Sequence, residues 1–156
     1  MSIATGRTRA TEDVDVLIPI MNKKKFKALF LDLEQNNFWC YQGESSDKTY
    51  EKYAKEKLNI RFARKDEMFP NMKVIFIDES RKAKYYEFAH PQKIKIGNFE
   101  FKIPLLEFEI LYKELMLSGK KDLEDAQHLR TIFSDILKEE RFNKCKEIIE
   151  KHGIKN

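Results

Sequence analysis

The sequence predicts a single α+β domain, with a short mixed sheet and flanking helices in about residues 1–103 and a helical bundle in about residues 104–156. The length of 156 residues is that of one domain with its own hydrophobic core. Short apolar segments with strand-like patterns fill most of the first part, and from Pro104 the period of the apolar residues changes from 2 to 3.6. Mixed strands and helices followed by helices alone are typical of the α+β class.

The first part of the chain predicts strands around one lysine-rich helix. The apolar, β-branched residues 14–19 predict a buried strand. Asn22 is the expected N-cap of a helix that ends near residue 36. The polar residues 42–57 are expected to form a loop with one helical turn. Further strands are expected at residues 38–41, 58–63, 72–77, 93–96 and 99–103, the last two joined by a turn at Gly97-Asn98.

The remaining elements are expected to be helices. Residues 80–88 predict a short helix that precedes the hairpin. Pro104 suits the first turn of a longer helix that Gly119 ends, a second helix begins near Asp122, and a third stops at Gly153. The residues expected to face inward in these three helices are Leu105, Phe108, Leu111, Leu115, Leu123, Ala126, Leu129, Phe133, Ile136, Phe142, Cys145, Ile148 and Ile149.

Composition excludes several classes of protein. The chain has 30 basic and 26 acidic residues, so its net charge of +4 permits a phosphate-bearing partner without demanding one. Cys40 and Cys145 form neither a disulfide framework nor a zinc-type pair, which favours a reducing cytoplasm, with Cys145 buried and inert. No apolar segment approaches the ~20 residues of a membrane span, and no secretory signal is expected.

The stretch with the clearest chemical pattern is residues 6–19, where Asp13 and Asp15 stand at the mouth of the first predicted strand. A period of 2 places both carboxylates on the same side of the sheet, where their repulsion is relieved by a cation. Hard oxygen ligands select Mg²⁺ or Mn²⁺, and Arg7 and Arg9 nearby suit phosphate oxygens. The alternative is that the two acids are a solvated strand edge or a turn cap.

Residues 9–16, RATEDVDV, resemble the R-x-T-x-D-[IV]-D signature of the DNA polymerase β-like nucleotidyltransferase superfamily. The similarity is to small bacterial members related to abortive-infection AbiE-type toxins and to minimal nucleotidyltransferases. Residues 106–129 resemble the later helix pair of that family, in which a lysine precedes a Gly-[RK]-x-K-D-x-x-D segment. The corresponding residues are Lys113, Lys121, Asp122 and Asp125, in a segment that is one residue shorter than the pattern between Gly119 and Lys121.

The resemblance implies an enzyme that transfers a nucleoside monophosphate from an NTP to a hydroxyl acceptor, with Asp13 and Asp15 holding the metal. A tRNA or a protein would be the acceptor, and an antitoxin would be a partner. The residues expected near the triphosphate are Arg9, Thr11, Lys113, Lys121 and Asp122. For Lys120 and Lys121, which follow Gly119, exposed loop charge is an equal alternative.

The chain departs from the family pattern at two places. Active members carry a Gly-Gly or Gly-Ser element upstream, of which Ser2 matches only the serine. Without the strand of that element, an exposed sheet edge is expected to favour a homodimer. Ile75 stands where the third carboxylate is expected, and Asp78 is the candidate substitute, unless it caps a helix. These departures favour an alternative in which the protein binds a nucleotide, nucleic acid or protein without catalysis. A third hypothesis is an interaction module with merely exposed acids.

The aromatic residues of the second predicted strand have two interpretations. Trp39, together with Phe38 and Tyr41, could stack on a nucleobase, although an aromatic strand more often belongs to a core.

Overall fold

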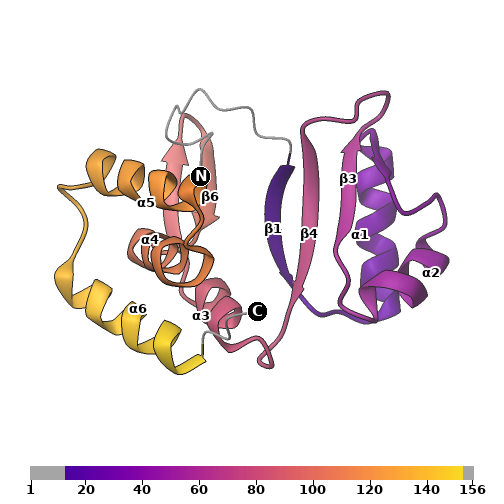
Figure 1. Ribbon diagram of the computed structural model, residues 1–156. Coiled ribbons are helices and arrows are strands. Elements are labelled where there is room, and N and C mark those ends of the chain that lie inside the picture. The colour runs from indigo at the N-terminus through magenta and orange to yellow at the C-terminus, as the bar shows by residue number, and fades with distance from the viewer. Residues whose placement is uncertain (1–12, 153–156) are drawn as a thin grey trace. The chain divides into compact units, whose positions relative to one another are not determined.

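The computed structural model describes residues 13–152, and these form an α+β protein, as the sequence predicts (Figure 1). The chain divides into two compact units, one ending at Asp78 and the other beginning at Glu79. This division does not coincide with the change from strands to helices that the sequence predicts near residue 103 of a single domain. The division comes earlier because Ala83 and Tyr86 of the short third helix pack with Phe108 and Cys145 of the later helices.

The first unit contains a four-stranded mixed sheet. Its strands lie in the order β1 (Asp13–Pro19), β4 (Asn71–Ile77), β3 (Ile60–Arg64) and β2 (Phe38–Cys40). β1 is parallel to β4, and the other two pairings are antiparallel. All four strands match sequence predictions, with ends that differ by two residues at most.

Helix α1 (Lys23–Gln35) covers one face of this sheet. Asn22 caps it as predicted, because its Oδ1 accepts a hydrogen bond from the Lys25 backbone N–H at 3.0 Å. Phe26 and Phe30 are almost completely buried against the strands, and the Phe30 and Phe62 rings meet edge to face at 5.6 Å. This aromatic core fixes which face of the sheet is available for other contacts.

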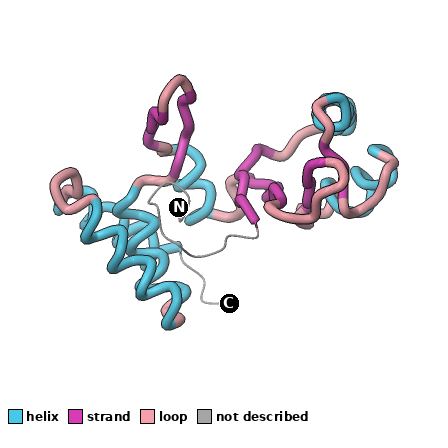
Figure 2. The backbone as a smooth tube through the Cα atoms, turned by 90° about the horizontal axis from the view of Figure 1, so that it is seen from above, coloured by secondary structure: helices cyan, strands magenta, loops and turns pink. Residues whose placement is uncertain are grey.

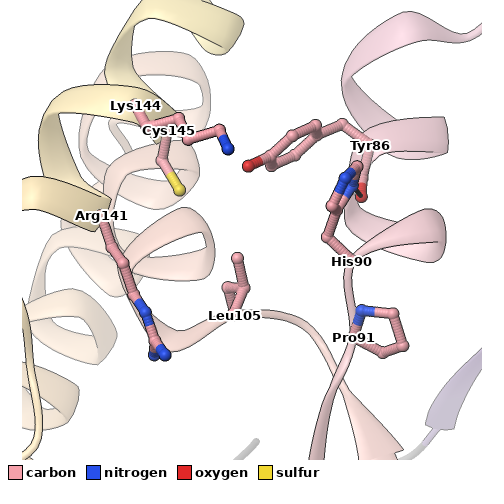
Figure 3. A pocket seen from close by; sticks show the side chains of 7 residues that line it. All are labelled: Tyr86, His90, Pro91, Leu105, Arg141, Lys144 and Cys145. Carbon is pink, nitrogen blue, oxygen red and sulfur yellow. Dashed lines mark hydrogen bonds between the residues drawn. The ribbon is translucent and has the colours of Figure 1, made fainter.

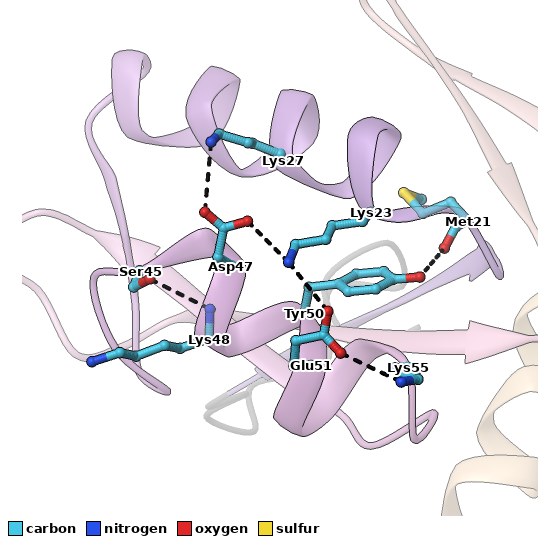
Figure 4. A network of polar contacts seen from close by, with 9 residues as sticks. All are labelled: Met21, Lys23, Lys27, Ser45, Asp47, Lys48, Tyr50, Glu51 and Lys55. Carbon is cyan, nitrogen blue, oxygen red and sulfur yellow. Dashed lines mark hydrogen bonds and ion pairs between the residues drawn. The ribbon is translucent and has the colours of Figure 1, made fainter.

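The segment between β2 and β3 is more ordered than predicted. It forms α2 (Ser46–Thr49) and the π-helical segment η1 (Tyr50–Ala54). Lys23, at the start of α1, forms ion pairs with Asp47 at 3.3 Å and with Glu51 at 3.2 Å. Figure 4 shows both pairs. These hydrogen-bonded pairs raise the pKa of Lys23 and lower the pKa values of both carboxyls. Because these partners come from different elements, the spacing of apolar residues within the segment did not reveal that it is ordered.

The second unit combines helices with a two-stranded hairpin (Figure 2). Its helices are α3 (Lys82–Ala89), α4 (Leu106–Tyr112), α5 (Lys120–Ile132) and α6 (Glu139–His152), with a π-helical segment η2 (Lys113–Leu117) that continues α4. The hairpin consists of β5 (Gln92–Ile96) and β6 (Phe99–Ile103), joined by the expected turn in which Gly97 has a φ of 59°. Within the described residues, no helix is long and apolar enough to cross a membrane.

Two details of the helices correct the sequence prediction. Ser118, with a φ of 49°, ends the α4–η2 helix, and Gly119 is instead the N-cap of α5. Leu123 and Ile136, both expected to face inward, are 45% and 57% exposed. The predicted stripe fails at Ile136 because α5 ends at Ile132, so helical spacing no longer applies beyond that residue.

Candidate functional site

Two acidic side chains share one face of β1. Asp13 and Asp15 occupy alternate positions of the strand, and alternate residues project from the same face of a sheet. Ile18 has the opposite parity and packs against the core beneath α1. The two carboxylates therefore lie on the face that α1 does not cover, which we call the open face. Asp13 is half-buried, and the Asp15 side chain is 56% exposed.

A lysine from the neighbouring strand reaches the second carboxylate. Lys73 of β4 is directly opposite Asp15 in the parallel pairing, and its Nζ lies 3.2 Å from Asp15 Oδ1. The Lys73 side chain is only 22% exposed, so the ammonium is partly shielded from water. The charge of Asp15 is thus already balanced by a side chain, and a metal ion bound there would share the carboxylate with Lys73.

Neither of the two positions considered for a third carboxylate supplies one beside the acidic pair. Ile75 is opposite Leu17, so the next position along the open face is apolar on both strands. Asp78 follows the end of β4, whereas Asp13 is paired with Asn71 at the beginning of that strand. The separation along the strand is roughly 23 Å. Asp78 forms an ion pair with Lys57, so the structure does not bring it to the acidic pair.

The second matched stretch forms a compact charge cluster in the other unit. Lys113 Nζ lies 3.5 Å from Glu109, 3.7 Å from Asp122 and 3.5 Å from Asp125, and its side chain is 13% exposed. The helix pair thus brings Lys113 and Asp122 together, but three carboxylates surround the ammonium. Lys121 is exposed in the first turn of α5. A Cβ at Gly119 would lie 3.0 Å from Asp122 Oδ2, so glycine permits this close approach.

The predicted site residues are divided between the two units, and three of them lie outside the described part of the chain. Ser2, Arg9 and Thr11 lie outside the described residues. Asp13, Asp15 and Asp78 belong to the first unit, and Lys113, Lys121 and Asp122 to the second. The structure therefore describes two separate groups of candidate residues, each within its own unit.

The acidic pair offers a divalent cation two carboxylates. Within residues 13–152, no group of three or more histidine, cysteine, aspartate or glutamate side chains could hold a metal ion. Mg²⁺ commonly binds through one or two carboxylates and takes its other ligands from water and substrate phosphates. The donor set of Asp13 and Asp15 fits such an ion when a phosphate group completes its coordination.

A cavity of about 320 Å³ in the second unit is a separate feature (Figure 3). Its wall includes the Tyr86 ring and the side chains of Arg141, Lys144 and Cys145. Burial, with a smaller contribution from the nearby charge of Glu107, raises the pKa of the Cys145 thiol to about 11. The thiol is therefore protonated at neutral pH, which confirms the prediction of a buried cysteine and makes it a poor nucleophile.

Two basic residues of the open face were not identified from the sequence. Arg61 of β3 is opposite Lys73 in the antiparallel pairing, so both project from the face that carries Asp15. Like charges directly opposite each other destabilise a sheet, and the contact of Lys73 with Asp15 relieves part of this repulsion. The available signal was a cation flanked on both sides by apolar residues within each strand, Arg61 between Ile60 and Phe62 and Lys73 between Met72 and Val74.

Comparison with models of protein families found no match for the chain, and comparison with curated proteins found no significant relative. The nucleotidyltransferase hypothesis therefore depends on the residues of this chain alone.

Proposed function

We propose that this protein is a metal-dependent nucleotidyltransferase that binds a nucleoside triphosphate on the open face of its four-stranded sheet. The observation that carries the proposal is the shared orientation of Asp13 and Asp15 on β1, at the start of an apolar strand. Together with phosphate oxygens and water, the two carboxylates would hold Mg²⁺ or Mn²⁺, which stabilises charge during displacement at phosphorus. Lys73 and Arg61 add positive charge on the same face.

The direct test is calorimetric titration with each of the four NTPs, with and without Mg²⁺. We expect Mg²⁺-dependent binding in the wild type and its loss in Asp13→Asn and Asp15→Asn. Asp32→Asn is a matched control, because Asp32 is an exposed acid of α1 in the same unit. Absence of binding for every nucleotide, or equal binding by all three variants, would contradict the proposal.

Binding without transfer is the second candidate function. The Lys73–Asp15 ion pair favours it, because the ammonium balances a charge that a second metal would otherwise balance. The apolar pairing of Ile75 with Leu17 also favours it, since neither side chain accepts a proton from an attacking hydroxyl. Release of pyrophosphate in the presence of tRNA or protein acceptors distinguishes the candidates, because only the transferase releases it.

The partners implied by this function are further parts of the proposal. The acceptor is a tRNA or a protein, and an antitoxin would neutralise the activity in a toxin–antitoxin pair. A homodimer is expected if the outer edge of β1 pairs with a second copy. Light scattering of the purified protein tests this last expectation, and a monomeric mass at micromolar concentration contradicts it.

A further inference from the structure

An aromatic pair stands on the open face at the sheet edge opposite to β1. Trp39 of β2 and Tyr41, which follows that strand, stack with ring centroids 4.6 Å apart and an interplanar angle of 23°. Phe38 and Cys40 have the opposite parity and pack in the core beneath α1. The Trp39–Tyr41 stack therefore lies on the same face as Asp13 and Asp15. Trp39 is 37% exposed, which is unusual for the largest apolar side chain.

Both aromatic rings are held in place through their polar atoms. Trp39 Nε1 donates a hydrogen bond to the Glu67 carbonyl oxygen at 3.0 Å, and the Tyr41 hydroxyl donates one to the Met68 carbonyl oxygen. Both acceptors belong to the β3–β4 connection. An open surface depression of about 360 Å³, lined by Trp39, Lys65 and residues 66–68, adjoins the stack. The aromatic surface is thus preorganised and borders a space that is large enough for a small ligand.

A row of side chains connects this stack to the acidic pair. Across the sheet, Asp15 is opposite Lys73, and Lys73 is opposite Arg61. The Tyr41 backbone N–H then donates to the Arg61 carbonyl oxygen at 2.9 Å, which places Tyr41 next in the row. The row covers three steps between strands, or roughly 14 Å. Its order is carboxylate, ammonium, guanidinium and aromatic ring.

We infer that the nucleotide lies across the strands, with its metal-bound phosphates at Asp13 and Asp15 and its base stacked on Trp39 and Tyr41. The inference rests on the proposed function, because it specifies where the substrate of that function binds. Lys73 and Arg61 lie between the two ends and face the phosphate chain, for which cations are the natural partners. Stacking tolerates every base, and the larger rings of purines gain more contact, so the substrate class is purine nucleoside triphosphates.

The single tryptophan of the chain makes this inference directly measurable. All tryptophan fluorescence comes from Trp39, so the emission of the wild-type protein reports on this one position. We expect Mg²⁺–ATP and Mg²⁺–GTP to quench it at saturation, pyrimidine triphosphates to bind more weakly, and Mg²⁺–tripolyphosphate, which lacks a base, to bind without quenching.

Variants then measure the contribution of the stack by calorimetry. Trp39→Leu should weaken ATP binding by roughly 5- to 150-fold and leave tripolyphosphate binding unchanged, whereas Trp39→Phe should retain most of the affinity. Leu31→Ala, which truncates an exposed apolar residue of α1 in the same unit, is the matched control and should bind ATP as the wild type does.

The outcomes separate this inference from the proposed function. If ATP binding requires Asp13 but neither quenches Trp39 nor weakens in Trp39→Leu, the base binds elsewhere and the inference is overturned while the proposed function stands. If neither ATP nor tripolyphosphate binds the wild type, both are overturned. Quenching needs no substitution, so it decides the question even if Trp39→Leu does not fold.

Discussion

At the scale of single residues, the contact between Lys73 and Asp15 controls the electrostatics of the open face. The ammonium is 3.2 Å from the carboxylate and partly shielded, so it competes with any cation for the same oxygen atoms. Removing it leaves the acidic pair with more negative charge. This competition is a consequence of strand register. Lys73 is far from Asp15 in the sequence, and the pairing of β1 with β4 places the two residues directly opposite each other.

Lys73→Met should therefore bind Mn²⁺ more tightly than the wild type, by roughly 2- to 5-fold, as expected for the loss of one partly exposed ion pair. Titration of Mn²⁺ monitored by electron paramagnetic resonance measures the free ion directly. Lys55→Met is the control, because Lys55 pairs with Glu51 away from the open face. Unchanged or weaker Mn²⁺ binding in Lys73→Met would show that the ammonium does not compete at this site.

The buried Cys145 thiol makes stability depend on pH in the alkaline range. Its pKa of about 11 in the folded protein exceeds the ordinary value of 9.0, because burial disfavours the thiolate. Between these values the unfolded chain has released the proton and the folded protein has kept it. The free energy of unfolding contributed by this group is thus complete below pH 9 and decreases as the pH rises toward 11.

We expect this contribution to decrease by up to roughly 2 kcal/mol between pH 8 and pH 11. Lysines and tyrosines titrate in the same range, so the measurement is the difference between wild type and Cys145→Ala in urea unfolding at each pH. The loss of stability with rising pH should be smaller in the variant. Parallel pH profiles for the two proteins would show that the folded thiol ionises normally.

At the scale of elements, the start of α1 combines a stabilising N-cap with unfavourable positive charges in the first turn. Lys23, Lys24 and Lys25 occupy its first turn, where the helix dipole disfavours positive charge, and no acidic residue is present in that turn. The side chain of Asn22 satisfies the Lys25 N–H, and Asp47 and Glu51 of the following segment approach Lys23. The helix therefore starts at a fixed residue despite its unfavourable charges.

Asn22→Ala should lower the free energy of unfolding by about 1 kcal/mol, because the Lys25 N–H loses its partner. Asn22→Asp keeps an acceptor and adds a negative charge near the helix N-terminus, so it should be at least as stable as the wild type. Urea denaturation of the three proteins at low salt measures both effects. Equal stability of Asn22→Ala and wild type would mean that water replaces the cap.

At the scale of the whole molecule, the two compact units each have their own hydrophobic cluster. Phe26, Phe30 and Phe62 belong to the first cluster, and Phe108 and Ile149 to the second. Each cluster draws its residues from one side of the division between Asp78 and Glu79. Loss of packing in one cluster should therefore destabilise the backbone hydrogen bonds of its own unit more than those of the other unit.

Phe30→Ala and Phe108→Ala remove completely buried rings and should each cost about 3–5 kcal/mol. We expect Phe30→Ala to accelerate amide hydrogen exchange in β1–β4 and α1 more than in α4–α6, and Phe108→Ala to do the reverse. Mass spectrometry of exchanged peptides resolves the two regions. Equal acceleration throughout the chain in both variants would show that the units unfold as one.

Most of the elements were determined by the sequence alone. Strands and helices follow from local period, the start of α1 from Asn22, and the shared face of Asp13 and Asp15 from their spacing of two. These features depend on residues a few positions apart, whose geometry is fixed by the backbone. The prediction was poorest at residues 42–57, where contacts with α1 and not hydrophobic period order the chain.

Only the tertiary structure decided which side chains meet on the open face. It placed Lys73 and Arg61 in one row with Asp15, added Trp39 and Tyr41 at the far edge, and put Asp78 at the other end of β4. It also assigned the short helix α3 to the second unit. The physical reason is that strand order and register join residues tens of positions apart, and local periodicity contains no information about which strands will pair.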